Sequence, residues 1–146
     1  MVIIRAMEKA DCKAAARLEK EIFSLPWSEQ GFLDALAMPE NIFLVAEEAG
    51  EIYGYIGMYV SLDEGEITNV AVAPEKRGAG VGGMLLKESL ELAGKKEIAQ
   101  VVLEVRVSNQ PAIHLYEKYG FEHCGVRKGF YDFPKEDAYI MMFHKK

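Results

Sequence analysis

The sequence predicts an α/β fold built on a mixed sheet rather than on a doubly wound parallel one. Strand-like runs and helical patterns follow one another in the order β-α-α-β-β-β-α-β-α-β-β. Two of the early strands are separated by a two-residue turn, which is the length of an antiparallel hairpin. The chain has 146 residues and no stretch that reads as a linker, so we expect a single domain over residues 1–146.

The first part of the chain is predicted to form one strand and two helices. Residues 2–7 (VIIRAM) are a short β-rich run. Apolar residues then recur at helical spacing from residue 8 to residue 23. Pro26 breaks this helix, and Ser28 is a suitable N-cap for a second, short helix that ends at Leu36.

Three consecutive strands are expected next. Residues 41–48 (NIFLVAEE) and 51–62 (EIYGYIGMYVSL) flank an Ala-Gly turn and predict an antiparallel hairpin. A second turn at residues 63–65 leads into residues 66–74 (EITNVAVAP), a third strand that Pro74 stops.

The second half of the chain alternates helices with strands. A glycine-rich segment precedes an amphipathic helix that contains Leu85 and Leu86. Ser108 or Asn109 is expected to cap the following helix, and Gly120 to end it. The remaining elements are a strand, this helix and two further strands: residues 100–107 (QVVLEVRV), 110–120 (QPAIHLYEKYG), 121–127 (FEHCGVR) and 137–144 (DAYIMMFH).

Composition excludes several classes of protein. The formal net charge of -6 disfavours a nucleic-acid partner and favours a cationic ligand such as an amine. Cys12 and Cys124 predict neither a disulfide framework nor, with only 3 histidines, a metal site. The charged N-terminal segment is no secretory signal, and no apolar run approaches the ~20 residues of a membrane span. We therefore expect a cytoplasmic protein without a membrane partner.

The glycine-rich segment is the clearest candidate for a ligand site. Gly78, Gly80 and Gly83 spell G-x-G-x-x-G, but residues 74–77 separate them from the strand, which a dinucleotide-binding turn does not allow. A Walker A loop fails because the segment closes with Gly-Gly-Met. Glycines between a strand and a helix N-terminus, preceded by Arg77, nonetheless suit a pyrophosphate.

These residues resemble a known family. V-x-P followed by R-G-x-G-x-G, in residues 72–82 (VAPEKRGAGVG), is similar to the acetyl-CoA-binding motif of the GNAT superfamily of N-acetyltransferases. Residues 103–121 resemble a later strand and helix of the same fold. Residues 26–32 (PWSEQGF) and 136–142 (EDAYIMM) extend the likeness to the bacterial ribosomal-protein-alanine N-acetyltransferases and other enzymes that acetylate protein N-termini.

The resemblance implies a GNAT (acyl-CoA N-acyltransferase) fold, with a mixed, mostly antiparallel twisted sheet flanked by helices. It implies acetyl-CoA as cosubstrate, no metal, and a protein N-terminus or other primary amine as acceptor. Such a protein would be a monomer or a weak homodimer. The resemblance also implies cofactor contacts at Val70, Ala71, Val72, Arg77, Gly78, Ala79, Gly80, Val81, Gly82 and Asn109. For Asn109, a plain helix cap is an alternative that is compatible with cofactor binding.

Glu104 is the predicted general base. It shares one strand face with Val102 and Arg106, and a carboxylate in so apolar a strand needs a reason. The alternative is a surface ion pair with Arg106. Glu66 is a rival base, since it lies five residues before Ala71, where histone-type members of the superfamily carry a catalytic glutamate; its alternative is a solvated side chain.

Tyr116 resembles the general acid of the family, which protonates the departing thiolate; an aromatic core residue is the alternative. Trp27 and Tyr131 are candidates for the acceptor groove, although Trp27 could instead be a hydrophobic staple to the second helix. Residues 129–133 (GFYDF) are expected to form an aromatic-rich connection. The acidic residues nearby would either receive a cationic N-terminus or be solvated: Asp132, Glu136 and Asp137.

The predicted function is transfer of an acetyl group from acetyl-CoA to a protein N-terminal α-amine, specifically the alanine of a small-subunit ribosomal protein. The pKa of an α-amine, ~8, mildly favours this acceptor over lysine at ~10.4, because less free energy is needed to deprotonate it. One alternative is an acetyltransferase for a small amine, a polyamine or lysine. Another is a non-catalytic CoA-binding module.

Overall fold

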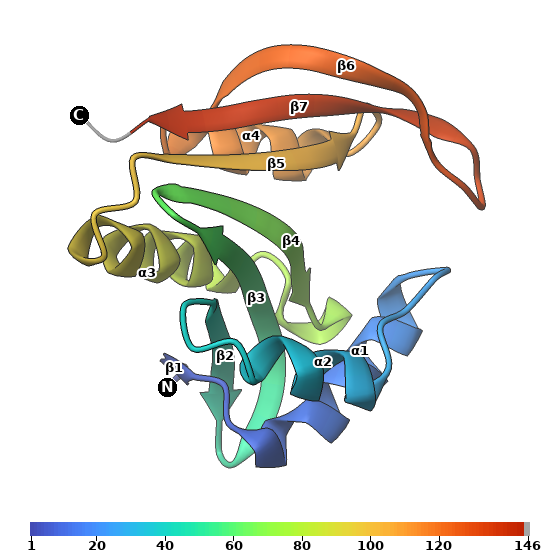
Figure 1. Ribbon diagram of the computed structural model, residues 1–146. Helices are drawn as coiled ribbons and strands as arrows, with labels where there is room; N and C mark the ends of the chain where they lie inside the picture. The colour runs from blue at the N-terminus through green and yellow to red at the C-terminus, as the bar shows by residue number, and fades with distance from the viewer. Residues whose placement is uncertain (145–146) are drawn as a thin grey trace.

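A 7-stranded sheet with helices on both faces forms the frame of the protein in the computed structural model, which describes residues 1–144 (Figure 1). The strands are β1 (Ile3–Ala6), β2 (Ile42–Glu48), β3 (Glu51–Ser61), β4 (Glu64–Val72), β5 (Gln100–Arg106), β6 (Glu122–Tyr131) and β7 (Glu136–His144). The α-helices are α1 (Cys12–Ile22), α2 (Glu29–Leu36), α3 (Val81–Lys95) and α4 (Gln110–Lys118), with short 3-10 turns η1 (Lys9–Asp11) and η2 (Pro74–Lys76).

The order of helices and strands confirms the predicted one, while several boundaries differ. Strand β4 begins at Glu64, which pairs with Ser61 of β3, so the turn predicted at residues 63–65 instead lies at residues 62–63. The first helix begins with a 3-10 turn, because the Asp11 carboxylate accepts a hydrogen bond from the Glu8 backbone N–H at 2.8 Å and pairs with Arg5. Strand β6 continues past its predicted end to Tyr131, which pairs with Glu136 of β7. The predicted aromatic connection is therefore partly strand.

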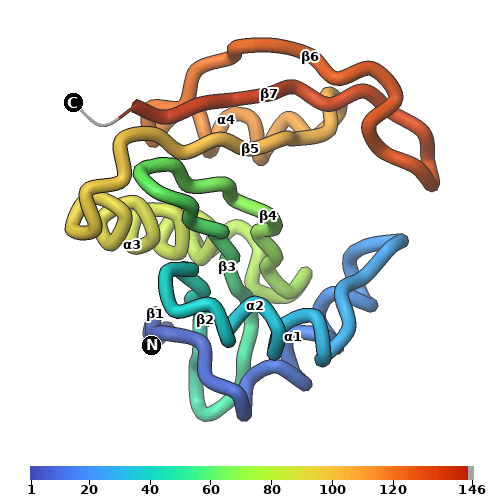
Figure 2. The backbone as a smooth tube through the Cα atoms, viewed as in Figure 1, coloured from blue at the N-terminus to red at the C-terminus, as the bar shows by residue number. Residues whose placement is uncertain are grey.

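The sheet is mixed, as predicted, and it consists of two antiparallel parts. Among residues 1–144 its strand order is β1-β2-β3-β4-β5-β7-β6, and β4 and β5 form the one parallel pair there. Their ladder contains the pairs Glu64–Gln100, Gly65–Val101 and Glu66–Val102. Beyond these pairs the two strands diverge, which is visible in the tube of Figure 2. The two parts of the sheet are thus joined at these three pairs and separated beyond them.

Two apolar clusters pack on opposite faces of the sheet, because successive residues of a strand point to opposite sides. In β2, Phe43 and Val45 contact the cluster that contains α1 and α2, whereas Ile42, Leu44 and Ala46 contact the cluster that contains α3 and α4. Cys12 is buried in the first cluster, while Cys124 is an exposed thiol. None of the helices in residues 1–144 has the length and apolarity needed to cross a membrane.

Leu85 of α3 offers a direct test of the larger cluster. Its side chain is 0% exposed, so replacing it with alanine should lower the free energy of unfolding by about 2–5 kcal/mol. Leu62, in the turn between β3 and β4, is 96% exposed, and its replacement by alanine should change stability by about 0.5 kcal/mol or less. Urea denaturation of both variants measures the difference, and equal midpoints would contradict this account of the core.

Candidate active site

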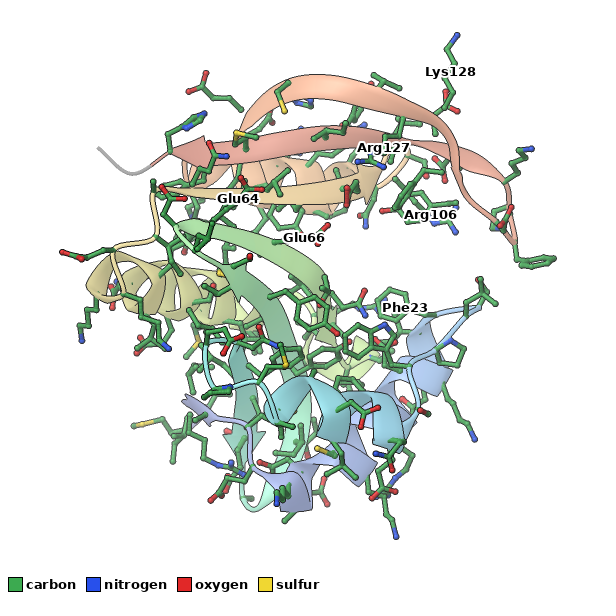
Figure 3. The ribbon with its side chains drawn as sticks, viewed as in Figure 1. Phe23, Glu64, Glu66, Arg106, Arg127 and Lys128 are labelled. Atoms are coloured by element: carbon green, nitrogen blue, oxygen red, sulfur yellow. The ribbon has the colours of Figure 1, made fainter. Side chains whose placement is uncertain are left out.

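A cavity of about 630 Å³ opens where β4 and β5 part. Its walls come from β4, β5, the start of α4, the connection between α1 and α2, and the β6–β7 hairpin. In Figure 3, Glu66 lies between the two diverging strands, while Phe23 and Arg106 stand on opposite sides of the opening. Segments that are far apart in the sequence therefore meet around one cleft.

A β-bulge shapes the β4 wall of this cleft. Gly57 of β3 pairs with Asn69 and Met58 pairs with Ile67, so Thr68 is the extra residue in β4. Beyond Glu66, the β5-facing edge of β4 has no strand partner within residues 1–144. Backbone groups around Val70 are thus available to hydrogen-bond a ligand in the cleft. Of the three cofactor contacts predicted in this strand, Val70 lines the cavity, whereas Ala71 and Val72 lie outside its lining.

The glycine loop joins β4 to the N-terminus of α3. Gly78 and Gly80 have φ angles of 83° and 80°, a left-handed conformation that glycine adopts most easily. The helix begins at Val81, so Val81 and Gly82 belong to its first turn rather than to the preceding loop. The Val81 side chain is 1% exposed and packs in the core, which leaves only its backbone for a ligand.

The surroundings of the loop fit a pyrophosphate. The first N–H groups of a helix have no partner within the helix, and those of α3 follow directly after Ala79 and Gly80. Arg77 is held beside them, because its Nε donates a hydrogen bond to the Val72 carbonyl at 3.2 Å. Its neighbour Lys76 is engaged elsewhere, in an ion pair with Glu48. Arg77 is therefore the cation of this segment that a phosphate group can reach.

Replacing Gly80 with alanine should lower stability by about 1–2 kcal/mol, because alanine is strained at a positive φ. The variant should also bind coenzyme A more weakly, since the loop must shift. Gly94→Ala is the matched control, because an added Cβ meets nothing within 4 Å there either, while the helical backbone suits alanine. This control should be more stable than the parent by about 0.4–1 kcal/mol. Thermal unfolding and calorimetric titration with coenzyme A measure both effects.

Glu104 lies on the cleft side of β5. Its side chain is 14% exposed, and its Oε2 lies 3.8 Å from Nε of Arg127 on β6. Burial is the main cause that raises the pKa of the Glu104 carboxyl; the charge of Glu66 raises it further, and Arg127 lowers it. Arg106 instead pairs with Glu136 at 3.1 Å, so the alternative of a Glu104–Arg106 surface pair is wrong.

Glu66, the rival base, faces Glu104 from β4. Its side chain is exposed, and it forms no ion pair or hydrogen bond with a side chain in the described part of the protein. Glu66 and Glu104 both line the cavity, from the two strands that part there, and the charge of Glu66 raises the Glu104 pKa. Two carboxylates therefore face one opening, which suits a cationic ligand.

Helix α4 brings Asn109 and Tyr116 to the same cavity. The Asn109 side chain caps the helix by accepting a hydrogen bond from the Ala112 backbone N–H at 3.3 Å, so the predicted cap is confirmed. Tyr116 is 8% exposed and packs against Phe121, with ring centroids 5.7 Å apart. Burial raises the pKa of Tyr116 above its ordinary value, so its hydroxyl stays protonated at neutral pH.

Trp27 and Tyr131 line opposite walls of the cavity. Trp27 precedes the Ser28 cap of α2 and contacts Phe32 at 5.2 Å between ring centroids, which confirms the hydrophobic staple. Arg106 lies over the Tyr131 ring at 4.4 Å. Burial, with the charge of Glu104, raises the pKa of Tyr131 to about 12.

The acidic residues of the β6–β7 hairpin differ in what they contact. Glu136 pairs with Arg106 and accepts a hydrogen bond from the Ser108 backbone N–H at 2.8 Å. Asp137 accepts one from the Gly129 N–H at 2.8 Å. Glu136 therefore attaches the hairpin to β5 and to the start of the β5–α4 connection, Asp137 links the two strands of the hairpin, and Asp132 lines the cavity.

Sequence reasoning missed two charged residues beside the cleft. Arg127 comes from β6 and could not be placed without the sheet register. Glu19 is 1% exposed and borders the cavity from α1. Its signal was present in the sequence, since Glu19 lies at helical spacing between the apolar Ala15 and Ile22.

Comparison with known proteins identifies this architecture. Residues 12–121 match the sequence model of the Acetyltransferase (GNAT) family. The chain belongs to the GNAT family of acetyltransferases. As a GNAT protein it is an acetyl-CoA-dependent N-acetyltransferase, and the predicted fold and enzyme class are confirmed. Within residues 1–144, no group of histidine, cysteine, aspartate or glutamate side chains is arranged to hold a metal ion.

The GNAT relatives match nearly the whole chain. A candidate ribosomal protein bS18-alanine N-acetyltransferase of Bacillus subtilis is 38% identical over 139 residues, which are 94% of this chain and 92% of the relative. The ribosomal protein bS18-alanine N-acetyltransferase of Escherichia coli K12 is 34% identical over 143 residues, 97% of this chain and 96% of that protein. A crystal structure of the ribosomal-protein-S18-alanine N-acetyltransferase from Escherichia coli superposes with a TM-score of 0.91 at 32% identity, covering 99% and 94% of the two chains.

Proposed function

We propose that this GNAT enzyme transfers the acetyl group of acetyl-CoA to the N-terminal alanine of a small-subunit ribosomal protein. The observation that carries the proposal is the full-length similarity to ribosomal protein bS18-alanine N-acetyltransferases, at 34–38% identity. The acidic cleft is compatible with this acceptor, because an N-terminal amine is largely cationic at neutral pH. The enzyme would act in the cytoplasm as a single domain, residues 1–146, and as a monomer or weak homodimer.

In this proposal the β4 edge and the glycine loop hold acetyl-CoA. The thioester supplies an activated acetyl group when the cosubstrate is bound. Backbone groups of residues 70–72 bind the pantetheine arm and the acetyl oxygen, since this edge of β4 faces the cleft without a strand partner among residues 1–144. Arg77 and the N–H groups of residues 78–82 bind the pyrophosphate. Asn109 lies close enough to the cleft to contact the arm while it caps α4.

Glu104 is the proposed general base. Burial raises the pKa of the Glu104 carboxyl and so brings it closer to the pKa of the amine. The charge of Arg127 lowers the Glu104 pKa and so favours the ionised form that accepts a proton. Deprotonating an α-amine at pH 7 costs roughly 1 kcal/mol, against more than 4 kcal/mol for lysine. A single carboxylate, directly or through water, is therefore sufficient for an N-terminus.

Tyr116 is the proposed general acid that gives a proton to the departing sulfur. Its hydroxyl is protonated at neutral pH because burial raises its pKa. Trp27 and Tyr131 form the walls between which the acceptor peptide enters, and Tyr131 is also protonated with a pKa of about 12. In these assignments Glu104 takes the proton from the amine, and Tyr116 gives a proton to the sulfur.

The charges next to Glu104 predict opposite shifts of the pH profile. The base must be ionised, so kcat should fall as pH drops through the Glu104 pKa, which lies above its ordinary value of 4.5. Arg127→Gln removes a charge that lowers this pKa, so the acid limb of kcat should move to higher pH by about half a unit to one unit. Glu66→Gln removes a charge that raises it, and the limb should move to lower pH by a similar amount.

Lys128→Gln is the control for these charge changes. This substitution also removes one positive charge. Lys128 is next to Arg127 in the sequence, but the Lys128 side chain points away from the cleft (Figure 3). Its acid limb should coincide with that of the parent enzyme. Shifts of the same sign in the Arg127 and Glu66 variants would show that Glu104 does not set this limb.

The acceptor is tested with a panel of amines in an assay that detects the free thiol of coenzyme A. The panel contains a peptide with the N-terminal alanine of a small-subunit ribosomal protein, the same peptide with a blocked α-amine and a free lysine, and a polyamine. We expect turnover of the first peptide alone, with the acetyl group located on the α-nitrogen by mass spectrometry. Turnover of the polyamine with none on alanine peptides would instead identify a small-amine acetyltransferase.

A further inference from the structure

Glu19 is a buried carboxylate to which the reaction assigns no role. It lies in the last turn of α1, is 1% exposed, and borders the active-site cavity. Both carboxylate oxygens are used. Oε1 accepts a hydrogen bond from the Trp27 backbone N–H at 2.9 Å, and Oε2 accepts one from the Tyr55 hydroxyl. Within residues 1–144 it has no cationic partner, so these two hydrogen bonds are what compensates its burial.

The two hydrogen bonds join parts of the protein that are separate in the sequence. Trp27 belongs to the connection between α1 and α2, which forms one wall of the acceptor groove. Tyr55 belongs to β3, where it pairs with Ala71 of β4, and the Asn69 side chain also interacts with its hydroxyl. Asn69 adjoins the bulge that forms the β4 wall. Glu19 therefore lies between the acceptor wall and the wall proposed to hold acetyl-CoA.

We infer that Glu19 is a positioning residue, which fixes the α1–α2 connection at a set distance from β4 and so determines how tightly the acceptor binds. The outer side of the connection is open to solvent, since Leu25 is 65% exposed and Pro26 is exposed as well. On its inner side the Trp27 ring packs on Phe32, Phe43 and Tyr59, and Glu19 adds the hydrogen bond that holds the Trp27 backbone. The inference deepens the proposed function, because it concerns the groove in which the acceptor would lie.

Glutamine at position 19 should preserve this role. Its carbonyl oxygen can accept from the Trp27 N–H, while its amide nitrogen can donate to the Tyr55 oxygen. Leucine has a similar volume but cannot accept a hydrogen bond, so the Trp27 N–H and the Tyr55 hydroxyl both lose their Glu19 acceptor, and each lost bond is costly. The pair Glu19→Gln and Glu19→Leu thus separates hydrogen bonding from packing. Glu21, exposed on the same helix, provides the matched control Glu21→Leu.

Trp27 reports its own position, because it is the only tryptophan of the chain. Its fluorescence requires no acceptor, so this measurement stands even if the proposed substrate is wrong. In Glu19→Leu the emission should shift to longer wavelength and acrylamide quenching should increase by about twofold or more, as expected when a buried hydrogen bond is lost and the loop opens. Glu19→Gln and Glu21→Leu should match the parent protein. Unchanged Trp27 fluorescence in Glu19→Leu would overturn the inference.

The kinetic test uses the acceptor peptide that the parent enzyme acetylates. Glu19→Leu should raise the KM of that peptide by about tenfold, while kcat and the KM of acetyl-CoA change by less than about threefold. Tyr55→Phe removes one of the two hydrogen bonds and should give an intermediate KM, which provides a second test if Glu19→Leu fails to fold. A fall of kcat in Glu19→Gln would mean that Glu19 carries a proton, and an unchanged peptide KM in Tyr55→Phe and Glu19→Leu would mean that it only supports the fold. Either result contradicts the positioning role.

Discussion

Replacing Glu104 with glutamine should lower kcat by a factor of about 10²–10⁴ at pH 7, which is the contribution expected of a general base. Glutamine fills the same volume and cannot accept the proton of the amine. The Glu104 side chain is only 14% exposed, but glutamine keeps its shape and polarity, so the variant should fold normally and retain its affinity for both substrates. Steady-state kinetics with the alanine peptide give kcat and both KM values, and thermal unfolding verifies that the fold is intact.

The loss caused by Glu104→Gln should also depend on pH in a defined way. The α-amine of the acceptor has an ordinary pKa of ~8, so an increasing fraction is already deprotonated as pH rises to 9. The variant should therefore recover part of its deficit between pH 7 and pH 9, because it depends less on a base there. A deficit that stays constant over this range would show that the missing carboxylate serves another purpose.

Glu66→Gln is the matched control for this experiment. It removes the second carboxylate that faces the cleft, and we expect kcat on its plateau to change by less than about threefold. Glu66 is the more exposed of the two and forms no ion pair within residues 1–144, while Glu104 is partly buried with a raised pKa. If Glu66→Gln lost activity and Glu104→Gln kept it, the rival assignment would be correct.

Local patterns made much of this protein predictable from its sequence. Ser28 and Asn109 are helix caps in the structure as predicted, and the alternating burial of β5 places Glu104 on the face expected. Positive φ angles at Gly78 and Gly80 account for the glycines of the loop. Such features depend on neighbouring residues, and that is why the sequence alone reveals them.

Features that depend on pairing between distant strands were not predictable. The ladder between β4 and β5 ends at Glu66, and the bulge at Thr68 turns the next residues toward the gap. Neither the length of a ladder nor the position of a bulge follows from residue type. The length of the ladder and the position of the bulge decide how close Glu66 comes to Glu104. The pairing of β6 in the sheet decides how Arg127 approaches Glu104.

Tyr116→Phe is expected to have the second largest effect, a fall in kcat of about 10²-fold or more, because the phenylalanine cannot protonate the departing sulfur. The substitution removes one oxygen and keeps the ring contact with Phe121, so stability should change little. Both KM values should stay near those of the parent enzyme. Tyr119→Phe, on the same helical segment and outside the cavity lining, is the control and should retain full activity.

The pH profile distinguishes Tyr116 from an aromatic residue that merely fills space. Burial is the first cause of its raised pKa, and the charge that Tyr131 acquires at high pH adds to it. The acid must be protonated to act, so its contribution persists below that pKa and is lost only as pH rises through it, above the ordinary value of 10.0. The kcat of the parent enzyme should therefore stay level from the end of its acid limb to about pH 10. A basic limb below pH 9 that disappears in Tyr116→Phe would contradict the raised pKa, and full activity of Tyr116→Phe would exclude Tyr116 as the acid.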